Sequence, residues 1–587
     1  MIDPLHADYS DTPISPGRPA LGYVPSRAGA KPCATIMTPF FNTGAIFHET
    51  ARSVFQQSLQ EWEWVIVNDG STDPESLSIL DGYRHRDPRI RVVDHQENRG
   101  LSAARNTGFR AANTPYVLQL DSDDLLEPRV AEMWFWCLES QPQFGFVTGY
   151  TVNFGAREYL WEAGFHDGEL FLEENRVDAN TMVRRSVHAD AGGYDESNRG
   201  GLEDREFWLR CADRGHWGTT VHEYGDWYRR RPVERGRWAN WDDGPRQAAF
   251  GEALQRRYGR LWEGGFPHVE PRQHVRHDRV RDWLPCENRL RKDAPRVVLV
   301  LPSISGDAGE SQLRLLELFR GQGWGVTVVS AAPGEVSTLV RFARQTPDLF
   351  VLPHFLPLGD YPRFIRYLIG SRDADAVVIS ASEFGYALLP YLRAHHPELP
   401  LVDHWPPTPG PWSLLGERYG GMLDLHLVGA GSCGGPAAPI GERVRMGAGQ
   451  ADGTGRSPAG TQTGADRCVV ASDVLDVAKE VRELAHVRRD PPPSLGLGLI
   501  AASQAIESQR LLEMSSDAAA WRAQVETRHQ ELESRMVESE SRSEELRARF
   551  EQLDSHMLRI YESLPARLYR GAKSLPAARR LGMRLRR

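Results

Sequence analysis

An acidic run follows a hydrophobic, strand-like segment in the first quarter of the chain. Residues 116–120 read Tyr-Val-Leu-Gln-Leu, and the next four are Asp121, Ser122, Asp123 and Asp124. Carboxylates clustered at a strand end are poor core formers, but they suit a hard divalent cation, which in turn binds the phosphates of a nucleotide. Acidic turns are common, so the meaning of this run depends on the residues that accompany it.

The chain around this run alternates between two kinds of apolar pattern. Short runs of consecutive apolar side chains, typical of buried strands, occur at residues 34–39, 64–68 and 90–93. Apolar side chains at helical spacing separate them, at residues 46–60 and around 77–83. This alternation predicts a mostly parallel sheet with helices on both faces, whose ligands bind beyond the carboxyl ends of the strands. We therefore expect one cleft to hold the acidic run and Asp69, which follows the second strand.

Length, charge and cysteine spacing narrow the class of protein. The chain has 587 residues, which suggests about two to four domains. Its formal net charge of −9 argues against nucleic acid as a partner. The six cysteines lie far apart without a C-x-x-C pair, so they indicate neither a zinc site nor a disulfide framework. No apolar run is long enough for a transmembrane helix, and we expect a cytoplasmic setting.

A second strand-and-helix pattern begins at residue 296. Strand-like runs lie at residues 296–301, 326–329, 349–352, 376–379 and 399–402. A helix-like stretch through residues 313–318 separates the first two of these runs. The pattern predicts a second α/β domain, and its apolar runs end near Gly429.

The remaining segments differ from these domains in composition. We expect, in chain order, a disordered leader (1–31), the first α/β domain (32–285), the second (296–429), a low-complexity linker (430–467), a helical remnant (468–514), a long helix of coiled-coil type (515–564) and a basic tail (565–587). The long helix could join copies of the chain into an oligomer. The tail could contact anionic lipid at a membrane surface, and a solvated tail is the equal alternative.

Several segments at expected strand and helix ends share a joint pattern with the acidic run. They are Thr38-Pro39-Phe40-Phe41-Asn42, Asn-Asp-Gly-Ser-Thr-Asp at 68–73, Asn-Arg-Gly-Leu-Ser-Ala-Ala-Arg-Asn-Thr-Gly at 98–108, Gly-Gly-Tyr-Asp-Glu at 192–196 and Gly-Leu-Glu-Asp-Arg-Glu-Phe-Trp-Leu-Arg at 201–210. In order and spacing they resemble the nucleotide-sugar-binding part of family 2 glycosyltransferases. That resemblance implies the GT-A fold for the first domain.

The resemblance also implies roles for the acidic residues. Asp123 would be the principal ligand of Mg²⁺ or Mn²⁺, with Asp121 contacting the ribose or the metal and Asp124 as a secondary ligand. Asp69 would contact the base of the nucleotide. Asn68 stands where the family often has an acid, but the second acid of that pair, Asp69, is kept.

The same resemblance assigns the rest of the donor site. The backbone around Thr38 and Pro39 would line the base pocket, and Phe40, Ser122 and Asn106 would belong to the nucleotide-sugar site. Arg105 would face the phosphates near the N-terminus of a helix, where a cation and backbone N–H groups can bind anions.

An inverting transfer needs a general base that takes a proton from the acceptor hydroxyl. Asp204 stands where the family carries this base, and Glu203 is the alternative. Acidic residues also favour a helix N-terminus for purely structural reasons, so this pair alone does not identify a base. Trp227 and the cluster Arg229, Arg230 and Arg231 resemble the closing segment of the domain, where they would contact the pyrophosphate or the acceptor. Taken alone, the three arginines favour a solvated face over a site.

The second domain resembles the first lobe of GT-B glycosyltransferases of family 4. The likeness rests on the Gly-containing turn at 306–310 and on Gly-Trp-Gly-Val-Thr-Val-Val at 323–329. The usual signatures of the donor-binding lobe are missing. Either the domain has lost the middle of that lobe, or residues 430–514 are a plain linker and helix. In both cases we expect the second domain to be inactive as a glycosyltransferase.

These observations predict a metal-dependent, inverting glycosyltransferase. It would move a sugar from a nucleotide diphosphate donor, with UDP preferred, to a hydroxyl of a glycan or glycolipid in bacterial surface polysaccharide synthesis. A non-catalytic scaffold with a vestigial site is the alternative, against which Asp69, Asp121, Asp123 and Asp204 argue. A nucleotide-sugar pyrophosphorylase would need a Gly-rich, basic signature after the first strand, which residues 40–44 lack.

Overall fold

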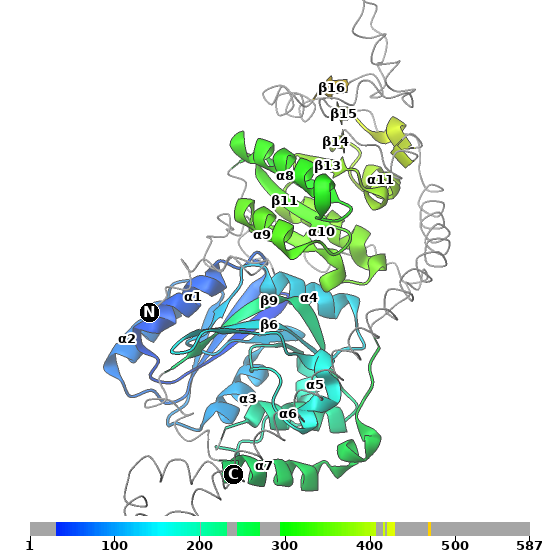
Figure 1. Ribbon diagram of the computed structural model, residues 1–587. Coiled ribbons are helices and arrows are strands. Elements are labelled where there is room, and N and C mark those ends of the chain that lie inside the picture. The colour runs from blue at the N-terminus through cyan, green and yellow to red at the C-terminus, as the bar shows by residue number, and fades with distance from the viewer. Residues whose placement is uncertain are drawn as a thin grey trace, which may run out of the picture. The chain divides into compact units, whose positions relative to one another are not determined.

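A computed structural model describes two α/β regions of the chain (Figure 1). The described residues are 31–199, 201–231, 244–270, 294–406, 415–416, 419–428 and 468–470. Both regions belong to one compact unit, Met1–Ala502. The predicted leader lies outside the described residues except for residue 31, and the helical remnant except for 468–470. The predicted linker, coiled-coil helix and basic tail lie outside them entirely. No helix in the described part has the length and apolar character needed to cross a membrane.

The first region contains a nine-stranded sheet among the described residues. Its strands run in the order β3-β2-β1-β4-β8-β6-β9-β5, and β7 pairs with β6. Their bounds are β1 Ala34–Phe40, β2 Trp62–Asn68, β3 Ile90–Asp94, β4 Tyr116–Gln119, β5 Leu125–Leu126, β6 Phe146–Gly155, β7 Tyr159–Trp161, β8 Met182–Arg184 and β9 Thr219–Arg230. Strands β1 to β4 are parallel, as predicted, whereas β8 pairs with β4 antiparallel and makes the sheet mixed.

Alternate side chains of the central strands pack on opposite helical layers, because successive residues of a strand face opposite sides of the sheet. Ile36 and Trp64 pack with α1 and α2, whereas Met37 packs with α3 and α6. The helices are α1 Phe47–Phe55, α2 Pro74–Arg84, α3 Leu101–Ala111, α4 Val130–Ser140, α5 Arg185–Asp190, α6 Glu203–Asp213 and α7 Gly244–Arg257. Figure 1 shows α1 and α2 on one side of the sheet and α3 and α6 on the other. The helix expected over 46–60 is shorter, ending at Phe55.

The second region contains a seven-stranded parallel sheet within the described part of the chain. Its order is β12-β11-β10-β13-β14-β15-β16. The elements are β10 Arg296–Leu301, α8 Gly306–Gly321, β11 Gly325–Ser330, α9 Val336–Gln345, β12 Leu349–Val351, α10 Tyr361–Arg372, β13 Ala376–Ser380, α11 Glu383–His395, β14 Leu401–Trp405, β15 Leu425–Val428 and β16 Cys468–Val470. The predicted α/β class is confirmed for both regions, while the exact domain limits stay a prediction.

Candidate active site

A deep cleft opens at the carboxyl ends of strands β1, β2 and β4. Its volume is about 1010 Å³, and its walls carry both acidic and basic side chains. The acidic residues that line it are Asp69, Asp121, Asp123, Asp124, Asp178, Glu203 and Asp204. The arginines are Arg105, Arg157, Arg199, Arg229, Arg230 and Arg231. The cleft therefore offers cations for phosphate oxygens and carboxylates for a cation or a proton.

The acidic run leaves β4 directly at the mouth of this cleft. Asp121 accepts hydrogen bonds of 2.9 and 3.3 Å from Nη2 of Arg105. Asp123 forms an ion pair of 2.7 Å with Arg231. The two carboxylate side chains keep 26% and 21% of their surface exposed, so both can be reached from the cleft.

Asp124 differs from the other two acids because it is buried and both of its carboxylate oxygens accept hydrogen bonds within the fold. Oδ1 accepts from the backbone N–H of Arg229 at 2.7 Å, and Oδ2 accepts from Nδ2 of Asn180 at 2.9 Å. Burial, together with the charges of Asp123 and Asp121, raises the pKa of Asp124 well above its ordinary value. These contacts make Asp124 an anchor between the acidic run and β9.

Arg105 lies between two acids and pairs with both, whereas the sequence predicted that it would face the phosphates of a donor. Its guanidinium is 1% exposed and donates to Asp121 on one side and to Glu203 at 2.7 Å on the other. Burial opposes the charge of Arg105, but Asp121 and Glu203 outweigh it and raise the pKa of the guanidinium. The side chain thus ties the acidic run to the start of α6.

Helix α6 begins with the two candidate base residues after a residue of unusual conformation. Leu202 has φ +57° and ψ +25°, a left-handed geometry that is uncommon for a branched side chain and typical of constrained sites. Asp204 accepts from Nδ2 of Asn175 at 2.8 Å and from the N–H of Arg205 at 2.8 Å. Burial, followed by the charge of Glu203, raises the pKa of Asp204 to about 7. Such a carboxylate can hold or release a proton near neutral pH.

Asp69 lines the cleft, but its carboxylate mainly organises the neighbouring loop. It accepts from the backbone N–H groups of Arg99 and Gly100 at 2.9 and 2.8 Å, and it bonds His95 at 2.7 Å. Gly70 follows with φ +68°, and a Cβ there would lie 2.4 Å from the backbone carbon of Glu97. The tight loop leaves Asp69 little capacity for a further contact.

The remaining predicted donor-site residues divide into two groups. Pro39, Phe40 and Ser122 line the cleft. Thr38 is fully buried, and its hydroxyl accepts from Nε1 of Trp64 at 3.0 Å. Asn106 is also buried and bonds the backbone of Tyr194 in both directions. Neither of the last two side chains lines the cleft, because each is used to hold the fold beside it.

Sequence reasoning missed a group of buried polar residues beneath the acidic run. Asn180 donates to Asp124 and, at 3.4 Å, to Asp226 of β9. Asp226 shares a hydrogen bond with Asp178, and burial raises the pKa of both carboxyls. Asn175, which orients Asp204, comes from the same polar stretch, residues 173–181. That stretch has no motif, and its polar character between two strands was the available signal.

The donor set suits a hard divalent cation only in combination with a ligand. Among the described residues, no group of three or more His, Cys, Asp or Glu side chains is arranged to hold a metal ion. Asp121 and Asp123 nevertheless offer partly exposed carboxylate oxygens, which Mg²⁺ and Mn²⁺ prefer, and such ions commonly complete their shell with substrate phosphates and water. The residues therefore fit a cation that is shared with a bound nucleotide.

Comparisons with known proteins find relatives and solved structures that are similar to part of this chain. EpsJ of Bacillus subtilis (strain 168), an uncharacterized glycosyltransferase, is 43% identical over 93 residues, which are 16% of this chain and 26% of EpsJ. The chondroitin synthase of Escherichia coli is 35% identical over 123 residues, or 21% of this chain and 17% of that enzyme. The crystal structure of S. aureus TarS is 18% identical, with a TM-score of 0.30, covering 34% of this chain and 37% of TarS.

These matches cover only part of each protein. The first curated relatives are matched over 20%, 26% and 48% of their own length. The model of the family described as "Glycosyl transferase family 2" matches residues 35–187, which carry the acidic run and most of the cleft. The chain therefore contains a glycosyl transferase family 2 domain in its N-terminal region.

Proposed function

We propose that the chain is an inverting glycosyltransferase that moves a sugar from a nucleotide diphosphate donor to an acceptor hydroxyl. One observation carries this proposal: the acidic run, six arginines and an acid with a pKa of about 7 line the same cleft, and most of the cleft lies in the part of the chain that the family 2 model matches. A nucleotide diphosphate needs cationic partners, and the acceptor needs a base. The cleft supplies both from separate segments of the chain.

In this proposal Asp121 and Asp123 bind Mg²⁺ or Mn²⁺ together with the donor phosphates. The cation would neutralise charge that develops on the departing nucleotide diphosphate. Arg231, which now pairs with Asp123, would move to the phosphates when the donor binds, because phosphate is an equally good partner for a guanidinium. Pro39 and Phe40 would line the base pocket, and the binding roles of Thr38 and Asn106 would be indirect.

Asp204 would act as the general base. Its carboxylate would take the proton of the acceptor hydroxyl while the hydroxyl oxygen attacks the anomeric carbon from the side opposite the leaving nucleotide. Asn175 orients one carboxylate oxygen, and Arg105 holds Glu203 beside it. Glu203 would therefore serve to raise the pKa of Asp204 and to position Arg105, and it is the alternative base.

The donor would be a UDP-linked sugar, and the acceptor a glycan or glycolipid in polysaccharide synthesis at the cell surface. The preference for UDP comes from the motif resemblance, in which Asp69 lies at the uracil. One relative is named as a chondroitin synthase, and that name supports this pathway class. The basic tail would bring the enzyme to the inner face of the membrane, and the second region, despite its resemblance to family 4, would not transfer sugar.

A donor-cleavage assay tests the proposal. The full chain would be incubated with a panel of UDP- and GDP-linked sugars, with Mn²⁺ or with EDTA, and the released nucleotide measured. We expect Mn²⁺-dependent release from at least one UDP-sugar. Asp204→Asn should still bind that donor in calorimetry but lose transfer by roughly 10²–10⁴-fold. A chain that binds no nucleotide sugar would instead support the scaffold alternative.

A further inference from the structure

Helix α4 follows the acidic run and is buried on all sides. Ten of its eleven residues are buried, including Trp134 and Trp136. Trp134 lies against Gly225 of β9, in the first region. Trp136 packs against Phe364 and Tyr367 of α10, in the second region, with ring centroids 5.3 and 5.1 Å apart. Because these side chains pack on both regions, α4 lies inside a core that the two regions share.

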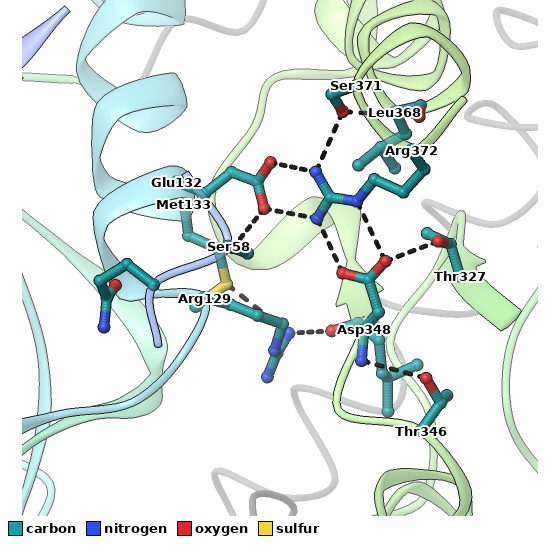
Figure 2. Close-up of polar contacts among 12 residues, drawn as sticks. Ser58, Arg129, Glu132, Met133, Thr327, Thr346, Asp348, Leu368, Ser371 and Arg372 are labelled. Atoms are coloured by element: carbon teal, nitrogen blue, oxygen red, sulfur yellow. Dashed lines mark hydrogen bonds and ion pairs between the residues drawn. The ribbon is translucent and has the colours of Figure 1, made fainter. Parts of the chain in front are cut away.

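A buried charge cluster joins the two regions at α4 (Figure 2). Arg372, at the end of α10, donates to Glu132 of α4 at 2.5 and 2.8 Å and to Asp348 before β12 at 2.7 and 3.0 Å. The three side chains are 2%, 0% and 2% exposed. Tyr367 and Ser58 each donate a hydroxyl to Glu132 at 2.6 Å. Every carboxylate oxygen of the cluster thus has a partner.

This cluster favours contact between the two regions. Charges removed from water cost several kcal/mol each unless they are paired and hydrogen-bonded, and removing one partner leaves the others uncompensated. Glu132 comes from the first region, whereas Arg372 and Asp348 come from the second. Separating the regions would leave Arg372 with one partner and Glu132 without its cation, so the cluster opposes their separation.

A second polar contact lies beside the first. Arg129, just before α4, contacts the backbone oxygen of Leu349 and pairs with Glu223 of β9 at 3.1 Å. His354, in the second region, bonds the other oxygen of Glu223 at 2.9 Å. Burial opposes the charge of Glu223, but Arg129 and His354 outweigh it and hold the pKa of Glu223 below its ordinary value. The second region therefore touches both the segment after the acidic run and strand β9.

These two elements are the ones that hold the acidic run in place. Strand β9 continues from Glu223 to Arg229, whose N–H binds Asp124 at 2.7 Å and whose Nε binds the backbone oxygen of Asp123 at 2.8 Å. The acidic run itself leads through β5 into Arg129 and α4. Strand β9 and the segment before α4 thus both hold the acidic run, and each contacts the second region a few residues away.

We infer that the second α/β region is a docked positioning part of the transferase, which fixes the acidic run through Arg372–Glu132–Asp348 and the Arg129–Glu223–His354 contact. This inference rests on the proposed function for the role of the acidic run. Arg372 and Glu132 are positioning residues, because they touch the supports of the site and not the cleft. The second region would then be needed for donor binding without binding the donor itself.

The test uses the full chain with Arg372→Met, which keeps the aliphatic length and removes the charge. We expect faster hydrogen exchange in peptides that cover 121–132 and 219–231, and a loss of affinity for UDP in the presence of Mn²⁺ by about tenfold, a coupling of ordinary size between linked sites. Arg372→Lys restores one charge and should recover most of that affinity. If Arg372→Met does not fold, Tyr367→Phe replaces it in the test. This variant removes one hydrogen bond to Glu132, and we expect the same effects on a smaller scale.

The matched control is Arg393→Met, in the same region but away from α4. Arg393 is buried and pairs with Asp424 at 3.0 Å, so its loss also destabilises the second region. We expect this variant to leave exchange at 121–132 and UDP affinity unchanged. Equal effects of Arg372→Met and Arg393→Met, or unchanged exchange at 121–132 in Arg372→Met, would overturn the inference. If the wild-type chain binds no Mn²⁺–UDP, the proposed function fails, and the exchange data alone decide the docking.

Discussion

The two sheets of this chain begin with the same topology and differ in the segments that leave their fourth strands. In both, the first four strands are ordered third, second, first, fourth: β3-β2-β1-β4 in one and β12-β11-β10-β13 in the other. After β4 the chain enters the acidic run, whereas after β13 it caps a helix, with Ser382 accepting from the N–H of Gly385 at 3.1 Å. Equal strand order therefore does not produce an equal site.

The charges that line the cleft and two buried ion pairs of the second region lie at opposite ends of their sheets. In the first sheet the acids and arginines gather at the carboxyl ends of the strands and line a cleft. In the second, the ion pairs Arg372–Asp348 and Arg393–Asp424 are buried where strands β12 and β15 begin. Asp403, farther along β14, is also buried and accepts from Tyr386, Trp405 and His426. Partly exposed charges can act on a ligand, while buried and satisfied ones stabilise the fold or a contact.

The sharpest test of this difference compares one acid from each sheet. Asp123→Asn should reduce Mn²⁺-dependent donor cleavage by roughly 10²–10³-fold, because a neutral amide binds a hard cation poorly and no longer balances charge in the cleft. Asp403→Asn should lower the melting temperature and leave the cleavage rate per folded molecule unchanged. The rates would be measured from nucleotide release. Similar activity in both variants would contradict the assignment of the site to the first sheet.

The pH dependence of transfer tests the role of Asp204 in the cleft. Burial and Glu203 raise its pKa to about 7, and only the deprotonated carboxylate can accept a proton. We expect the rate to rise about tenfold per pH unit below this value and to level off above it, as for a single base. Asp204→Asn should abolish the rise. A wild-type rate that is flat between about pH 5.5 and 8.5 would exclude Asp204 as the base.

The loop after β2 gives a test of backbone geometry near the cleft. Gly70→Ala places a Cβ against the backbone of Glu97 in a left-handed conformation, so the free energy of unfolding should fall by about 2–4 kcal/mol. Gly82→Ala, in α2 with open space around it, should raise it by about 0.5–1 kcal/mol. Chemical denaturation measures both changes. Equal stability of the two variants would show that the loop around Asp69 tolerates rearrangement.

A buried acid that does not line the cleft gives a test of how stability depends on pH. Burial raises the pKa of Glu127 from its ordinary value of 4.5 to about 7, so the folded state keeps a proton that the unfolded state loses. The stability that this group contributes is therefore present below pH 4.5 and declines as the pH rises to about 7. Glu127→Gln should remove this decline and be more stable than wild type by roughly 1–3 kcal/mol at high pH. Thermal melts at low and high pH measure it, and a pH-independent difference would argue against protonation.

Much of the first region could be predicted because its signals are local. The apolar runs at 34–39 and 64–68 are parts of strands β1 and β2, and the acidic run lies at the end of β4, as expected. The motif at 201–210 starts helix α6 with Glu203 and Asp204 in the cleft. By contrast, strand β9 was not predicted, because it pairs with β6 across a long stretch of sequence and its apolar and polar residues do not alternate simply.

Within the site, local motifs predicted candidates but not their partners. Asp121 and Asp123 reach the cleft, as the pattern indicated, and Asp124 does so with both oxygens already bonded. The partners of these acids, Asn180 and Arg229, are 56 and 105 residues away from Asp124 in the chain. No local spacing rule relates residues so far apart, since sheet pairing decides which of them meet.

The sequence by itself determined which chemical groups follow which elements. An acidic run follows one strand, a glycine-containing loop follows another, and a pair of acids begins a helix. These depend on residue type and short spacing, which survive any rearrangement of distant segments. Only the tertiary structure decided that Arg105 joins Asp121 to Glu203, that desolvation and Glu203 raise the pKa of Asp204 to about 7, and that Arg372 pairs with Glu132. Each of these depends on desolvation and on contacts between distant segments, and both arise only when the chain packs.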